Sequence, residues 1–109
     1  MKHFADNPFF DYPKNINVLI RTDIGGSYGL AHATRCRALA YALVARGAQV
    51  AFLTTTPALR DFVAPWECWC PTDVSERSIF GSILGHEPDV VIFDTVSPFG
   101  EELYPLIME

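Results

Sequence analysis

A histidine, an arginine and several glycines lie close together near the start of the chain. These residue types can bind an anionic substrate and move a proton. They occupy the segment Gly25-Gly26-Ser27-Tyr28-Gly29-Leu30-Ala31-His32-Ala33-Thr34-Arg35-Cys36. Its glycines can adopt a positive φ and allow a ligand to come close to the backbone. Its imidazole titrates near neutral pH, so this segment is a candidate for general-base chemistry.

The glycines are expected to form the turn between a strand and a helix. We take Gly25, Gly26 and Gly29 as candidate substrate-binding positions, because the unpaired N–H groups at a helix start attract anions such as phosphate. The spacing matches neither the dinucleotide fingerprint G-x-G-x-x-G nor the phosphate loop G-x-x-x-x-G-K-[ST]. A flexible connection that binds nothing is therefore the alternative interpretation.

His32 falls in the first turn of the expected helix, where the helix dipole favours the neutral imidazole. A neutral imidazole can act as a base, but a histidine that only caps its helix fits the spacing slightly better. Asp23 could orient the ring in either case, and it is also a candidate substrate-binding residue. Arg35 lies one turn further on, so it could face the same ligand or the solvent.

Asp94 ends a second apolar run and is the other candidate catalytic residue. Ligands of open parallel sheets bind outside the carboxyl ends of the strands. An acid at this position could contact a ligand hydroxyl or orient His32. A strand-end aspartate that only caps the following turn is an equal alternative.

Apolar runs that alternate with helical patterns predict an α/β fold, a Rossmann-like parallel sheet with flanking helices. The expected strands cover residues 17–21, 49–54, 66–70 and 89–94. The expected helices cover 30–46, 57–63, about 74–84 and 99–108, with Thr56 and Asp73 as N-caps of the second and third, and with Gly47 and Gly85 ending the first and third. The natural strand order is 3-2-1-4, which brings the loops that follow strands one and four to the same crevice.

Length and charge limit the classes of function. The 109 residues, half of them apolar, suffice for one small domain. We place it at residues 17–109, after an N-terminal arm at 1–16. A net charge of -5 with acids and bases intermixed argues against a nucleic-acid partner. The sequence indicates neither a membrane segment nor a signal peptide, so a cytoplasmic protein is expected.

The remaining chemically interesting side chains are expected to be structural. Cys68-Trp69-Cys70 is too tightly spaced for a Cys-x-x-Cys metal or redox site, so we predict no metal and no cofactor, and buried or half-buried thiols. Trp69 and Trp66 are expected to pack rather than to bind a sugar. His86 is expected in a loop at the amino-terminal edge of the sheet, without a functional role. Arg37 and Arg46 are expected on the solvated surface.

The glycine and histidine segment resembles a known signature. Behind the strand Val18-Leu19-Ile20-Arg21, the run from Gly29 to Ala40 is similar to the G-x-G-H-x-x-R-x-x-x-L-A pattern of GT-B nucleotide-sugar enzymes. The first half of the chain is most similar to the UDP-sugar hydrolases of pseudaminic acid biosynthesis, in Ile20-Arg21-Thr22-Asp23 and Arg35-Cys36. The second half resembles family-28-like glycosyltransferases, in Pro98-Phe99-Gly100 and Leu103-Tyr104-Pro105-Leu106. Ala31 departs from the pattern, which has its second glycine there.

The resemblance implies an incomplete N-terminal half-domain of a GT-B fold. It also implies the acceptor side of an enzyme that transfers or hydrolyses a nucleotide-diphosphate sugar. By this resemblance His32 would activate the attacking hydroxyl, and the glycine loop with Arg35 would assist the leaving diphosphate. GT-B enzymes bind the nucleotide mainly through a second domain, so the expected partners are a nucleotide sugar, an acceptor and a separate donor-binding subunit. This chain alone is then expected to be inactive. The alternative is a non-catalytic binding or scaffold subunit that pairs with such a donor domain.

Overall fold

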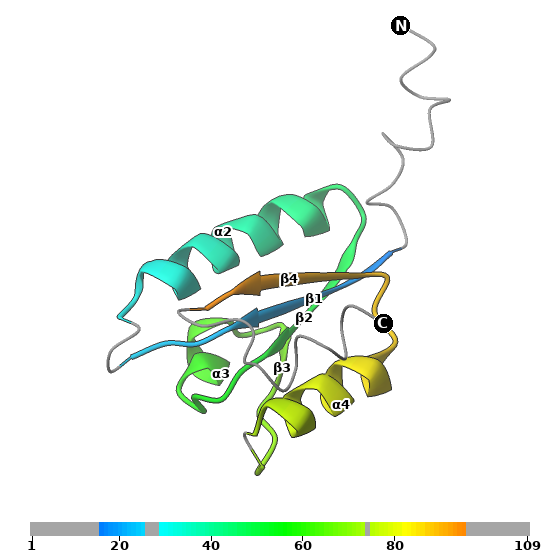
Figure 1. Ribbon diagram of the computed structural model, residues 1–109. Coiled ribbons are helices and arrows are strands. Elements are labelled where there is room, and N and C mark those ends of the chain that lie inside the picture. Colours follow the sequence, from blue (N-terminus) through cyan, green and yellow to red (C-terminus); the bar gives the residue numbers. More distant parts are fainter. Residues whose placement is uncertain (1–15, 26–28, 74, 96–109) are drawn as a thin grey trace, which may run out of the picture.

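A four-stranded parallel sheet with helices on both faces forms the structure, a computed structural model that describes residues 16–25, 29–73 and 75–95 (Figure 1). The strands are β1 (Asn17–Thr22), β2 (Gln49–Leu53), β3 (Glu67–Trp69) and β4 (Val90–Asp94). The helices are α2 (Ala31–Ala45), α3 (Leu59–Phe62) and α4 (Glu76–His86). This confirms the predicted α/β, Rossmann-like class. The expected helix at 99–108, and the expected N-terminal arm except for residue 16, lie outside the described residues.

The strands follow the order β3-β2-β1-β4, and every pair is parallel, as the sequence predicted. The chain moves outward from β1 through β2 to β3 and then crosses back to place β4 on the other side of β1. In open parallel sheets, connections that diverge in this way mark the edge where ligands commonly bind, here the carboxyl ends of β1 and β4. The loop after β1 and the last residue of β4 therefore lie at the same edge.

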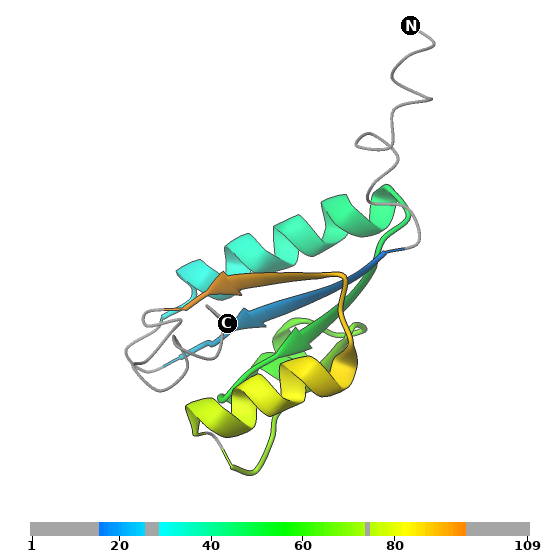
Figure 2. The same ribbon diagram turned by 45° about the vertical axis from the view of Figure 1, so that its right-hand side comes forward.

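Apolar side chains on β1 alternate between two cores, which explains its nearly continuous apolar sequence. Val18 and Ile20 pack with buried residues of α2 and α3, whereas Leu19 packs with Ile79 and Ile83 of α4. Figure 2 shows α2 and α4 on opposite sides of the sheet. The two cores hold α2 against one face of the sheet and α4 against the other.

Helix α4 begins and ends later than predicted. Its N-cap is Ser75, whose hydroxyl accepts a hydrogen bond from the Ser78 N–H at 3.2 Å. Asp73, the predicted cap, instead accepts from the Ser75 N–H at 2.9 Å and shapes the turn before the helix. Gly85 does not end the helix, which continues to His86 and ends at Glu87 with a φ of 50°.

Helix α3 is shorter than predicted, because its expected cap is used elsewhere. Its N-cap is Ala58, which makes no side-chain capping bond. The Thr56 hydroxyl accepts from the Ile24 N–H at 2.9 Å and lies 2.9 Å from the Thr54 hydroxyl. It therefore ties the loop after β2 to the loop after β1 rather than starting a helix.

Side chains from α2 and α3 hold these two helices together. The Arg37 guanidinium, expected on the solvated surface, is half-buried 4.1 Å from the centroid of the Phe62 ring and donates to the Phe62 carbonyl at 3.1 Å. Trp66 packs as predicted, with its ring centroid 4.6 Å from that of Tyr41.

Gly47, with a φ of 96°, follows the end of α2 as expected. Over the described ranges, no helix combines the length and the apolar character that crossing a bilayer requires.

Candidate functional site

The carboxyl-terminal edge of the sheet brings three of the predicted site residues together. Asp94 is the last residue of β4 and pairs in register with Thr22 at the end of β1. His32 and Arg35 lie three residues apart near the start of α2, so they share one face of that helix. The parallel register carries Asp94 to this face across 62 positions of sequence.

Asp94 is held by both side chains at short distances. His32 Nδ1 lies 2.6 Å from Asp94 Oδ1. Arg35 donates from Nε to Oδ2 and from Nη2 to Oδ1, each at 2.7 Å. This two-pronged contact matches the guanidinium fork to the carboxylate and fixes the orientation of both groups.

The Arg35 contact also fixes the protonation of the site. The Arg35 guanidinium hydrogen-bonded to Asp94 holds the pKa of that carboxyl well below its usual range, and outweighs the opposing effect of burial. An ionised carboxylate only accepts hydrogen bonds, so the proton of the 2.6 Å contact lies on His32 Nδ1. The 3.0 Å approach of Arg35 Nη2 to His32 Nδ1 is then a contact between two donors and not a hydrogen bond.

With its proton on Nδ1, a neutral His32 carries its lone pair on Nε2. The side chain of His32 is 24% exposed and that of Asp94 is 18% exposed, so a ligand can reach the ring. Arg35 is 60% exposed, and its Nη1 makes no hydrogen bond in the described ranges. The arrangement is an oriented base beside a donor that remains available to an anion.

Two residues that the sequence analysis did not select complete the support of Asp94. The Thr22 hydroxyl donates to the Asp94 carbonyl at 2.8 Å, and Cys36 Sγ lies 3.4 Å from Asp94 Oδ2. Cys36 is buried, as predicted, and burial raises the pKa of its thiol to about 11. It is therefore a neutral donor at pH 7. The sequence feature that could have identified Cys36 was its position four residues after His32, on the same face of the helix.

Asp23 does not orient His32 and lies in a neighbouring polar cluster. Its buried Oδ1 accepts from Arg21 Nη1 at 2.9 Å, from the Thr54 hydroxyl at 2.9 Å, and from the Thr55 N–H at 2.8 Å. Burial opposes ionisation, but the bonds from Arg21 and Thr55 prevail and lower the pKa of Asp23. Its Oδ2 has no partner within the described ranges. Asp23 thus joins the ends of β1 and β2.

The glycine loop has the backbone geometry that the sequence predicted at its two described ends. Gly25 has a φ of 83° and Gly29 a φ of 63°, and the Gly25 N–H donates to the Gly29 carbonyl at 3.0 Å. Gly26 lies outside the described residues. Ala31 is the first residue of α2, a helical position that alanine accepts, and the N-cap Leu30 makes no side-chain capping bond. The first N–H groups of α2 are therefore not used by a side-chain cap.

Comparisons with known proteins assign no family: no family model matches the chain, and neither a curated protein nor a solved structure is significantly similar to it. Within the described ranges, no three His, Cys, Asp or Glu side chains are grouped closely enough to hold a metal ion. We therefore base the proposed function on the geometry around Asp94.

Proposed function

We propose that this chain is the N-terminal, acceptor-side part of a glycosyltransferase-like enzyme that acts on a nucleotide-diphosphate sugar, with His32 as its general base. One observation carries the proposal: the 2.6 Å contact from His32 Nδ1 to an Asp94 carboxylate that Arg35 keeps ionised. An attacking hydroxyl or water needs a base, and such a base contributes about 10²- to 10⁴-fold to a rate.

The proposed step is a displacement at the anomeric carbon of the sugar. His32 Nε2 takes the proton of the acceptor hydroxyl, or of water, as its oxygen bonds to that carbon. The bond from the carbon to the diphosphate oxygen breaks, and the diphosphate leaves with the electron pair. The Asp94 carboxylate stabilises the imidazolium that forms without taking its proton, because Arg35 keeps that carboxyl acidic.

The start of α2 supports the assignment of an anionic leaving group. Its N–H groups have no side-chain cap, and the positive φ at Gly29 turns the chain directly before them. Arg35 Nη1 is a further donor at this helix end. Since Asp94 already neutralises most of the Arg35 charge, we assign Arg35 first to positioning Asp94 and second to the diphosphate.

We also propose a cytoplasmic location. The three thiols Cys36, Cys68 and Cys70 are all unpaired in the structure. Free thiols of this kind persist in reducing compartments.

The test is the release of nucleoside diphosphate from a panel of nucleotide sugars, by the full chain together with any donor-binding subunit that copurifies with it. We expect His32→Gln to lower the rate by about 10²- to 10⁴-fold. Ala45→Gln is the matched control, since it places the same side chain at an exposed position at the opposite end of α2 from His32. Unchanged turnover in His32→Gln would remove the base. A failure of every nucleotide sugar to bind to the complex with the donor-binding subunit would remove the substrate class.

A further inference from the structure

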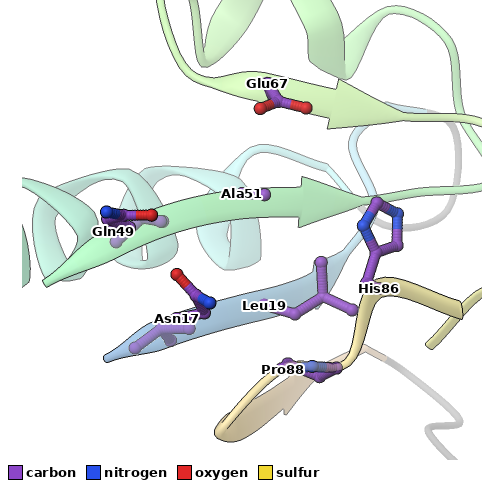
Figure 3. Close-up of a pocket in the computed structure, with 9 residues that line it drawn as sticks. Asn17, Leu19, Gln49, Ala51, Glu67, His86 and Pro88 are labelled. Atoms are coloured by element: carbon purple, nitrogen blue, oxygen red, sulfur yellow. The ribbon is translucent and has the colours of Figure 1, made fainter. Parts of the chain in front are cut away.

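A cavity of about 180 Å³ lies at the amino ends of the strands, opposite the edge that carries His32 and Asp94. Figure 3 shows its lining on one face of the sheet. Residues from three strands and from the end of α4 line it, among them Asn17, Leu19, Gln49, Ala51, Glu67 and His86. The reaction proposed above makes no use of this cavity.

The hollow follows from the strand register and from the length of α4. Leu19, Ala51 and Glu67 lie side by side on β1, β2 and β3. The short side chain of Ala51 therefore leaves a depression between its two larger neighbours. Helix α4 covers this face of the sheet through Ile79 and Ile83, and it ends at His86. The amino halves of the strands therefore extend beyond the helix that covers the rest of the face.

His86 is the last residue of α4 and not a loop residue as the sequence predicted. Its ring meets Trp69 edge-on, with the ring centroids 4.2 Å apart and the planes at 78°. The indole of Trp69 is 47% exposed, so only part of it is used for packing. This contact fixes the imidazole as one wall of the cavity, at the end away from Asn17 and Gln49 (Figure 3).

The polar groups that line the cavity favour one sign of ligand charge. Glu67 is the single charged side chain among its lining residues, and no lysine or arginine is among them. The Asn17 and Gln49 side chains, paired in register, add amide oxygens. None of these three side chains makes a hydrogen bond within the described ranges. An anion would meet an uncompensated carboxylate here, whereas a cation would meet an ion-pair partner with amide acceptors beside it.

We propose that this cavity binds a small organic cation, a primary ammonium or a guanidinium on a short aliphatic stem. The charged head lies on the Glu67 carboxylate, and the stem lies over the apolar floor formed by Ala51 and Leu19. The negative net charge of the chain attracts such ligands from solution. The site does not depend on the proposed sugar chemistry, because it lies at the other edge of the sheet.

The experiment is an NMR titration of the isotope-labelled full chain with n-butylammonium and with n-butylguanidinium. We expect saturable amide shifts at Ala51, Glu67 and His86, with a dissociation constant on the order of 1 mM for ligands of this size. Unshifted amides at His32 and Thr22 would separate this site from the other edge. 1-Butanol and butyrate are the neutral and anionic compounds of matched length, and each should bind about two- to fivefold more weakly, as expected for an ion pair with the exposed Glu67 carboxylate. Equal shifts with the alcohol, or no saturable shift with either cation, would overturn the proposal.

Two variants test the same site independently. Glu67→Gln keeps the shape of the side chain and should weaken cation binding about two- to fivefold while leaving the response to 1-butanol unchanged. Ala51→Leu fills the hollow and should abolish binding of both cations. Asp61→Asn is the control, because it removes the same charge at an exposed position of α3, which packs on the other face. Full affinity in Glu67→Gln would overturn the proposal, whether or not Ala51→Leu folds.

Discussion

Replacing Asp94 by asparagine tests both the stability and the chemistry of the site. The substitution preserves shape but removes the charge that Arg35 and His32 share. It also presents an amide that can donate to His32 Nδ1 and so move the ring proton to Nε2. Loss of the equivalent carboxylate in a serine-protease triad costs about 10⁴-fold. We expect Asp94→Asn to lower turnover by about 10²- to 10⁴-fold.

The expected loss of stability is smaller than the number of bonds to Asp94 suggests. Charge-assisted hydrogen bonds contribute about 1.5–3 kcal/mol each when they are sheltered. The Arg35 side chain is 60% exposed, however, so solvent screens its share. The contact with His32 is better sheltered, at 24% and 18% exposure of the two side chains. We therefore expect Asp94→Asn to lower the free energy of unfolding at pH 7 by about 1–2 kcal/mol.

The pH dependence gives the sign of this contribution. The folded pKa of Asp94 lies below its ordinary value, so its contribution is complete above about pH 4, the ordinary pKa of an unfolded aspartate. The contribution decreases as the pH falls from there toward the folded pKa. Wild type and Asp94→Asn should therefore differ at pH 7 and become more similar at pH 3.

Urea denaturation followed by circular dichroism at both pH values measures these differences. Asp61→Asn, an exposed aspartate on α3, is the control for removal of a carboxylate. Long-range proton–nitrogen NMR spectra report which nitrogen of His32 carries the proton. The reasoning fails if the stability gap between wild type and Asp94→Asn is the same at pH 3 as at pH 7. It also fails if neutral His32 in the wild type carries its proton on Nε2.

Two further predictions concern the thiols and the glycines. Burial raises the thiol pKa values of Cys36 and Cys68 to about 11, so both should react with iodoacetamide at pH 8 more slowly than Cys70. Mass spectrometry of the native protein would measure the labelling rates. Rapid labelling of Cys36 would contradict its burial. Gly29→Ala should cost about 1–2 kcal/mol in urea denaturation, since its φ is 63° although a Cβ would meet no atom within 4 Å. Gly81→Ala, in the middle of α4, should instead stabilise by about 0.5–1 kcal/mol, and equal effects at the two positions would refute the conformational argument.

The strand order could be predicted because it depends on features that are local in sequence. The apolar runs around Val18 and Val90 mark the buried strand β1 and the half-buried strand β4, and short connections with right-handed crossovers leave few arrangements. The same reasoning placed Asp94 and His32 at one edge of the sheet. Their contact, across 62 positions of sequence, was only one of the alternatives that the sequence left open for Asp94.

The details that the sequence did not predict depend on competition between neighbouring residues. Asp73 and Ser75 are both good N-caps, and only the tertiary position of α4 selects the serine. Gly85 resembles a helix end, but Glu87 takes the left-handed conformation instead. The side-chain conformation that directs Arg35 onto Asp94 is also not encoded in spacing, so solvent and substrate were equally good expectations. The sugar chemistry itself stays a prediction.

The contact between His32 and Asp94 can form only after β4 has paired with β1. His32 lies on the helix that follows β1, whereas Asp94, which orients its ring, lies at the end of β4. The hydrogen bond from the Thr22 hydroxyl to the Asp94 carbonyl spans 72 positions of sequence. During synthesis, a chain that has not yet paired β4 with β1 holds a histidine without its orienting partner. Pairing of such distant segments occurs late compared with local helix formation. The ring proton of His32 therefore reports when β4 has paired with β1, and His32 is oriented for the proposed role only from that point.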